Sequence, residues 1–171
     1  MDVPSKTWRG CAVLSPGLSA RRQDVLSLYL DAGYPTTLIL SLATPEGGLD
    51  DRHEAALSIT FRNLVKVLPE LLNLKKSGDK DDTYAIMHVP LDAIEVKRRC
   101  IALEMGTPFS QLIDLDVYDG SGTRISRALL GLTPRPCLAC GQRAADCIRH
   151  RHLTPAEIPG RLHELLAHLR D

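Results

Sequence analysis

The stretch Leu112-Ile113-Asp114-Leu115-Asp116-Val117, with the turn Asp119-Gly120-Ser121-Gly122 after it, decides the fold class that the sequence predicts. Apolar and polar residues alternate in the first stretch, which is typical of a strand, here expected over 109–118. The turn glycines indicate that the chain from Thr123 folds back as a hairpin partner. Because this hairpin follows a region in which strands and helices alternate, we predict an α+β fold, a single domain with a mixed sheet flanked by helices.

The regions on either side supply the other elements of this fold. Apolar spacing and breaks at proline and glycine predict strands at 8–14, 37–43 and 83–89, and helices at 19–32, from 50 or 51 to 67, and at 92–106. A further turn is expected at 69–74 and a charged surface loop at 75–82. Thr154, Pro155 and Glu157 have the pattern of a helix start, so a C-terminal helix is expected to follow a cysteine-rich loop.

Composition favours one globular domain over 1–171 and argues against several other classes of protein. The chain has 171 residues, of which 44% are hydrophobic and 25% charged, as in an ordinary globular domain. Lys+Arg and Asp+Glu both total 21, and this zero net charge argues against a nucleic-acid-binding protein. No apolar run approaches the roughly 20 residues of a membrane-spanning helix, and residues 1–15 lack the layout of a signal peptide. We therefore expect a cytoplasmic protein that does not associate with membranes.

Asp114 and Asp116 are the first candidate site. Residues two apart in a strand point to the same side, so these carboxylates repel each other unless a cation lies between them. Mg²⁺ prefers oxygen ligands and is commonly held by one or two carboxylates together with substrate phosphates. The pair therefore predicts a Mg²⁺ site for phosphoryl or nucleotidyl transfer. The alternative is an exposed acidic strand face, because Asp-x-Asp is a short and common pattern.

A second candidate site lies in the cysteine-rich segment 133–153. The chain has five cysteines, an odd number, which fits reduced thiols or a metal site better than a set of disulfides. Cys137 and Cys140 form a C-x₂-C pair, and Cys147 and His152 follow. Three thiolates and one imidazole make a tetrahedral zinc set without an open position, so zinc here would be structural. A loop of reduced cysteines and a redox-active C-x₂-C pair are the alternatives.

Several sequence blocks follow one another within about forty residues, and their order and spacing are specific. The blocks are 112–117, Gly122 with Ile125-Ser126-Arg127, Leu130-Gly131, Pro134-Arg135-Pro136-Cys137-Leu138-Ala139-Cys140, and then Cys147, Arg149 and His152. In these blocks the chain resembles the apo-citrate lyase phosphoribosyl-dephospho-CoA transferases, also called holo-citrate lyase synthases. It departs from the pattern of that family at Ser110-Gln111, where a Gly-Arg pair is usual.

The resemblance implies a nucleotidyltransferase. Its donor would be 2′-(5″-triphosphoribosyl)-3′-dephospho-CoA, and its acceptor a serine of the apo acyl carrier subunit of citrate lyase, with release of pyrophosphate. One alternative is the same chemistry on another carrier, such as that of malonate decarboxylase. A further alternative is a zinc-stabilised adaptor that binds a carrier protein without catalysis, which the missing Gly-Arg pair would favour.

Charged residues around the aspartates are further candidates. Arg124 and Arg127 follow the turn, and a planar guanidinium suits phosphate oxygens. Arg127 is the stronger candidate because it lies in a family block, and its alternative is a surface arginine on the hairpin. Lys97 and Glu104 match family positions and lie on nearly the same face of the helix 92–106. Lys97 could pair with a phosphate or with an acidic neighbour, and Glu104 is either a third metal ligand or a solvated charge. The expected site residues are thus Asp114 and Asp116 for catalysis, Arg127, Arg124 and Lys97 for substrate binding, and Asp114, Asp116 and Glu104 for Mg²⁺.

Overall fold

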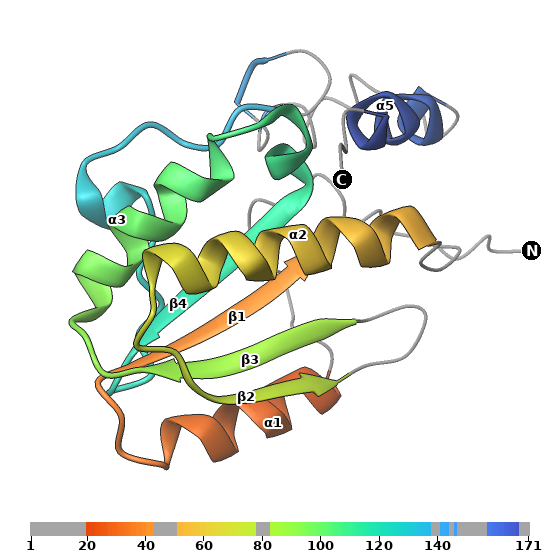
Figure 1. Cartoon of the computed structure of the whole chain (residues 1–171). Helices are drawn as coiled ribbons and strands as arrows, with labels where there is room; N and C mark the ends of the chain where they lie inside the picture. Colours follow the sequence, from red (N-terminus) through yellow and green to blue (C-terminus); the bar gives the residue numbers. More distant parts are fainter. Residues whose placement is uncertain are drawn as a thin grey trace, which may run out of the picture.

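Four strands form an antiparallel sheet in the computed structural model, which describes residues 20–42, 51–77, 83–137, 141–143, 146 and 157–167. The strands are β1 (Thr36–Leu42), β2 (Leu72–Ser77), β3 (Tyr84–Val89) and β4 (Ile113–Asp119), in the order β2-β3-β1-β4 (Figure 1). The predicted α+β class is confirmed, but the sheet is antiparallel rather than mixed. The reason is that β3 and β4 run in the same direction with β1 between them, so they never become parallel neighbours.

Helices cover both faces of this sheet. They are α1 (Ala20–Leu30), α2 (Asp51–Val67), α3 (Ala93–Glu104) and α5 (Glu157–Leu166), with the short 3₁₀ helices η1 (Pro108–Leu112) and η2 (Ala128–Leu130). α2 and α3 lie on one face and α1 lies on the other (Figure 1). Since side chains alternate along a strand, Leu38 and Leu40 of β1 join the core under α2 and α3, whereas Ile39 joins the core under α1.

Most elements predicted from the sequence are confirmed. The strands expected at 37–43 and 83–89 are β1 and β3, and the helices expected from 19, 50 or 51, and 92 are α1, α2 and α3. The strand expected at 8–14 and the helix start at Thr154 lie outside the described residues. After the turn that follows β4, the chain forms one isolated bridge, between Tyr118 and Arg124, instead of a full hairpin strand.

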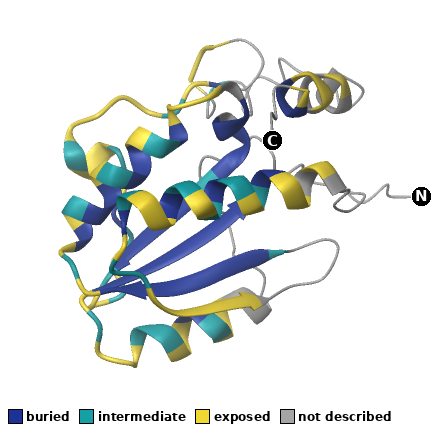
Figure 2. Ribbon diagram, viewed as in Figure 1, coloured by how far each residue is buried: buried dark blue, intermediate teal, exposed yellow. Residues whose placement is uncertain are grey.

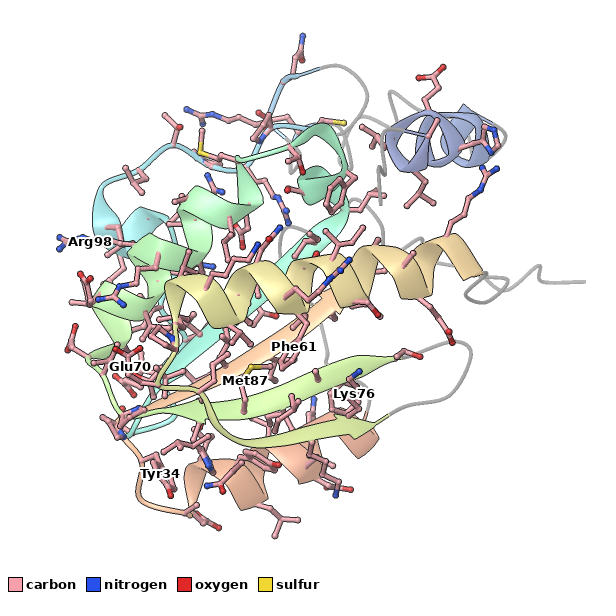
Figure 3. The ribbon with its side chains drawn as sticks, viewed as in Figure 1. Tyr34, Phe61, Glu70, Lys76, Met87 and Arg98 are labelled. Carbon is pink, nitrogen blue, oxygen red and sulfur yellow. The ribbon has the colours of Figure 1, made fainter. Side chains whose placement is uncertain are left out.

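β2 is the strand that the sequence did not predict. Residues 72–77 form an edge strand where a turn and a charged loop were expected, and residues 72–76 are exposed (Figure 2). The register shifts beside Asn73, which has a left-handed φ of 52°, so the alternation typical of a strand is broken. Contacts with residues distant in sequence anchor it instead. Asn73 Nδ2 lies 3.1 Å from His88 Nδ1, and Lys76 Nζ lies 5.9 Å from the centre of the Phe61 ring (Figure 3).

α3 and η1 determine where β4 enters the sheet. The Asp92 side chain accepts hydrogen bonds from the backbone N–H groups of Ile94 at 2.9 Å and Glu95 at 3.2 Å, which fixes the start of α3. Buried residues of α3, among them Val96 and Cys100, then pack against the sheet. Residues 109–112 of η1 occupy the start of the strand expected at 109–118, so β4 begins at residue 113. Among the described helices, none is both long and apolar enough to cross a membrane.

We expect Asp92→Ala to lower the free energy of unfolding by about 1 kcal/mol, because two N–H groups of the first turn lose their acceptor. Asp92→Asn keeps an acceptor oxygen and should be nearly neutral. Urea unfolding followed by circular dichroism would measure both. Equal losses in the two variants would contradict the capping role.

Candidate functional site

Asp114 and Asp116 lie on the same side of β4, as the sequence predicts. In the sheet, Asp116 is paired with Ile39 and Asp114 with Ser41, so both carboxylates belong to the face that also packs against α1. The Asp116 side chain is 2% exposed, whereas the Asp114 side chain is 25% exposed. β4 therefore holds one carboxylate inside the protein and a second within reach of a ligand.

An arginine from a later segment lies beside each aspartate. Arg124 Nη2 donates to Asp116 Oδ1 in a close ion pair. Arg135 Nη1 lies 3.8 Å from Asp114 Oδ1, a much looser contact. Burial lowers the pKa of Arg124, but the carboxylates of Asp116 and Asp114 outweigh it and raise that pKa above its ordinary value. Arg124 therefore remains a cation at this site.

The pKa of Asp114 is raised by its surroundings. Burial, followed by the charge of Asp116, raises the pKa of Asp114 from 3.8 to about 6, and the charge of Arg135 offsets only part of this rise. A raised carboxyl pKa means that the folded protein disfavours negative charge at this position. A bound cation would remove the penalty, so the surroundings of Asp114 suit a ligand that brings positive charge.

Lys97, Glu104 and Arg127 form a separate buried network beside β4. Arg127 Nη2 donates to Glu104 Oε2 at 2.8 Å, and Lys97 Nζ lies 3.5 Å from Glu104 Oε1. Burial raises the pKa of Glu104, but Lys97, Arg135 and Arg127 together lower it below its ordinary value, so Glu104 is ionised. Both carboxylate oxygens of Glu104 thus already have protein partners.

The described residues contain no group of three or more His, Cys, Asp or Glu side chains that could hold a metal ion. Glu104 is therefore not gathered with Asp114 and Asp116 into the expected set of three ligands. Metal binding stays a prediction, and the geometry narrows the candidate ligands to the two aspartates. Likewise, phosphate binding by Lys97 and Arg127 stays a prediction for two side chains that are both bound to Glu104.

Arg135 is a site residue to which the sequence assigned no role. Its Nη2 atom donates to the backbone oxygens of Ile113 and, at 3.2 Å, of Ser110, while Nη1 approaches Asp114. Arg135 thereby joins the segment before the cysteine-rich loop to the start of β4. Its position between Pro134 and Pro136 was a usable signal, since two prolines restrict the backbone around one cation.

The predicted zinc set lies mostly outside the described residues. Cys140, Cys147 and His152 are not described, and zinc binding stays a prediction. Cys137 is buried, and its carbonyl oxygen accepts from the backbone N–H of Gly141 at 3.2 Å.

We expect Asp114→Asn to stabilise the protein at pH 8 and to have little effect at pH 4. The raised pKa means that the folded state binds the Asp114 proton more tightly than the unfolded state does. Ionising Asp114 as the pH rises through about 6 therefore destabilises the fold, by about 3 kcal/mol once both states are ionised. Urea unfolding of the variant and the wild type at both pH values would measure the difference.

Asp119→Asn is the matched control on the same strand, and its expected effect on stability at high pH is opposite to that of Asp114→Asn. A hydrogen bond from the Ser121 side chain is the largest cause that lowers the pKa of Asp119, and a backbone bond from Thr123 adds to it. Its ionised form therefore stabilises the fold, so Asp119→Asn should lose stability at pH 8 relative to pH 3. A pH-independent effect of Asp114→Asn would contradict the raised pKa.

Comparisons with known proteins identify the family. The family model described as apo-citrate lyase phosphoribosyl-dephospho-CoA transferase (CitX) matches residues 34–168. The chain is 36% identical over 166 residues to a probable apo-citrate lyase phosphoribosyl-dephospho-CoA transferase of Streptococcus pyogenes, covering 90% of this chain and 84% of that protein. It is 32% identical over 145 residues to Protein CitXG of Haemophilus influenzae and 28% identical over 144 residues to Protein CitXG of Leuconostoc mesenteroides.

The chain spans 31% of the length of each of these two CitXG proteins, while the matches cover 79% and 80% of the chain itself. The matched part of the chain contains all four strands and both aspartates of β4. The resemblance seen in the sequence blocks is thus confirmed, and this chain belongs to the apo-citrate lyase phosphoribosyl-dephospho-CoA transferase family.

Proposed function

We propose that this chain transfers a phosphoribosyl-dephospho-CoA group to apo-citrate lyase, with a serine of the acyl carrier subunit as acceptor and pyrophosphate as leaving group. The observation that carries the proposal is the aspartate pair of β4 with Arg124 and Arg135 beside it. The family description supports the transferred group and the acceptor protein, since it names both. The side chains support the class of reaction, because transfer from a triphosphate needs a proton acceptor and cations near the phosphates.

In the proposed step, the acceptor serine Oγ bonds to the phosphorus nearest the ribose of the donor. The bond from this phosphorus to the pyrophosphate oxygen breaks, and pyrophosphate leaves with the electron pair. The serine proton passes to the Asp114 carboxylate. Asp114 suits this role because its carboxylate is ionised at neutral pH and is the more accessible of the two, at 25% exposure.

Asp114 and Asp116 also fit Mg²⁺. They place carboxylate oxygens on one face of a strand, and their repulsion contributes to the raised pKa of Asp114, which is the situation that a hard cation relieves. A bound Mg²⁺ ion would neutralise charge on the triphosphate. Asp116, being the more deeply buried of the two, would be the fixed ligand, and the more accessible Asp114 would face the acceptor.

Arg124 is the best-placed residue for the donor phosphates. Its side chain is 31% exposed, whereas that of Arg127 is 14% exposed and bound to Glu104. In this proposal, Arg124 turns from Asp116 to a phosphate oxygen when the donor binds, so that its charge neutralises the aspartate first and the substrate afterwards.

We expect the purified protein, supplied with Mg²⁺, the triphosphoribosyl-dephospho-CoA donor and the apo acyl carrier subunit, to increase the mass of the carrier by one phosphoribosyl-dephospho-CoA group. Asp114→Asn should lower the rate of this gain by about 10²- to 10⁴-fold, because it removes the proton acceptor. Intact mass spectrometry of the carrier would measure the rate, and a pyrophosphate assay would test the leaving group.

Asp119→Asn is the control for these assays, since Asp119 ends the same strand but bonds to its own turn. It should keep wild-type activity. Absence of any mass gain by folded wild-type protein, with a carrier that another synthase can modify, would overturn the proposed donor and acceptor. A mass gain on the carrier of malonate decarboxylase alone would move the proposal to that acceptor.

Arg124→Gln is expected to raise the KM for the donor by about tenfold or more, because one charged hydrogen bond to phosphate is lost. Arg124→Lys keeps the charge without the planar guanidinium, so its KM for the donor should lie between those of the wild type and Arg124→Gln. Steady-state kinetics at saturating carrier would measure the KM. An unchanged KM in Arg124→Gln would exclude contact between Arg124 and the donor.

A further inference from the structure

β4 lies at the edge of the sheet, so one row of its backbone groups faces away from β1. Such a row is usually bonded by another strand, by water, or by covering side chains. Beyond the turn, the chain itself bonds part of the row, since the Ile125 N–H donates to the Val117 carbonyl at 2.8 Å. Among the residues that the structure describes, no strand lies beside Leu115, at the middle of β4, on this edge.

Two charged side chains of α3 take the place of the missing strand at Leu115. The Leu115 N–H donates to Glu104 Oε1 at 3.3 Å, and Lys97 Nζ donates to the Leu115 carbonyl oxygen at 2.6 Å. Lys97 and Glu104 are seven residues apart, so two turns of helix bring them to the same face of α3. Their side chains are 8% and 3% exposed, so both backbone bonds are shielded from water.

Leu115 is the residue between the two aspartates. Its N–H belongs to the peptide group shared with Asp114, and its carbonyl belongs to the peptide group shared with Asp116. Holding both groups fixes the backbone from which the two carboxylates project. Because the side chain of Leu115 points into the opposite core, packing and hydrogen bonding restrain this residue from two directions.

We propose that Lys97 and Glu104 are positioning residues: by bonding both peptide groups of Leu115 from the open edge of the sheet, they set the placement of Asp114 and Asp116. This inference rests on the proposed function, in which those aspartates act on the donor and the acceptor. It gives Lys97 and Glu104 roles different from phosphate binding and metal ligation. Arg127 supports the pair through its bond of 2.8 Å to Glu104 Oε2.

The decisive variant is the double substitution Lys97→Met/Glu104→Met. A single substitution leaves one buried charge without its partner and can prevent folding, whereas replacing both members of a buried ion pair with apolar residues is often tolerated. Arg127 also loses its partner Glu104, but its side chain is 14% exposed, so its charge can turn towards water. The double variant should therefore still unfold cooperatively, at a lower stability than the wild type. We expect its kcat to fall by about 10- to 100-fold while the KM for the donor changes by less than about threefold, because the aspartates are displaced but the donor contacts remain.

Glu95→Gln is the matched control. It breaks another ion pair of α3, the exposed contact of 2.9 Å between Arg99 and Glu95, and should leave kcat and KM unchanged. A folded double variant with wild-type kcat would overturn the positioning role. A raised KM with an unchanged kcat would also overturn it, and would indicate that Lys97 binds the donor.

Amide hydrogen exchange at Leu115 separates this inference from the proposed function. In the double variant, the Leu115 amide should exchange faster and the carboxyl carbon resonances of Asp114 and Asp116 should shift, whereas Glu95→Gln should change neither. If the wild type transfers no group to the carrier, the proposed function fails while these NMR measurements still decide the positioning role. Unchanged exchange and resonances in the double variant would overturn it.

Discussion

Burial of charge along β4 is the constraint on which the other features of this site depend. Asp116 is 2% exposed, and Glu104, beside the strand, is 3% exposed. A carboxylate in such surroundings destabilises the fold unless cations or hydrogen-bond donors lie next to it. Within the described chain each of these two has a close arginine, and the arginines come from the segment after the strand rather than from the sheet. The path of the chain from the turn to Arg135 therefore determines which cations lie beside the carboxylates of the site.

The arginines neutralise the two aspartates of β4 unequally, and this difference gives the two carboxylates different chemical properties. Asp116 has a close ion pair with Arg124, while the contact between Asp114 and Arg135 is 3.8 Å long. Burial and the charge of Asp116 raise the pKa of Asp114, and the loose contact with Arg135 offsets only part of this rise. The two residues share a strand face and a residue type, so the environment alone separates a group suited to hold charge from one suited to accept a proton.

The sequence predicted the fold class, the helices α1 to α3, the strands β1 and β3, and the shared face of Asp114 and Asp116, since periodicity and caps report local structure directly. It missed β2, which lacks a strand pattern of its own but pairs with β3 and contacts His88 and Phe61. It also missed Arg135 and the bonds from α3 to Leu115, because spacing along one helix shows that two charges share a face but not which backbone group they meet. Those facts depend on contacts between segments far apart in the sequence.

The position of the acidic strand at the edge of the sheet follows from the same constraint. A central strand has both rows of backbone groups bonded to neighbouring strands, which leaves no backbone group for an arginine or lysine to bond. β1 is such a strand, and its described side chains are almost wholly apolar or small hydroxyl groups. At the edge, by contrast, α3 and the segment after the turn supply cations to the backbone and carboxylates of β4 together. Lys97 and Glu104 bond the open backbone at Leu115, Arg124 pairs with Asp116, and Arg135 does both, since it bonds the Ile113 carbonyl and approaches Asp114. The bonds that satisfy the edge and the charges that make the two carboxylates tolerable thus come from neighbouring side chains on the same side of β4.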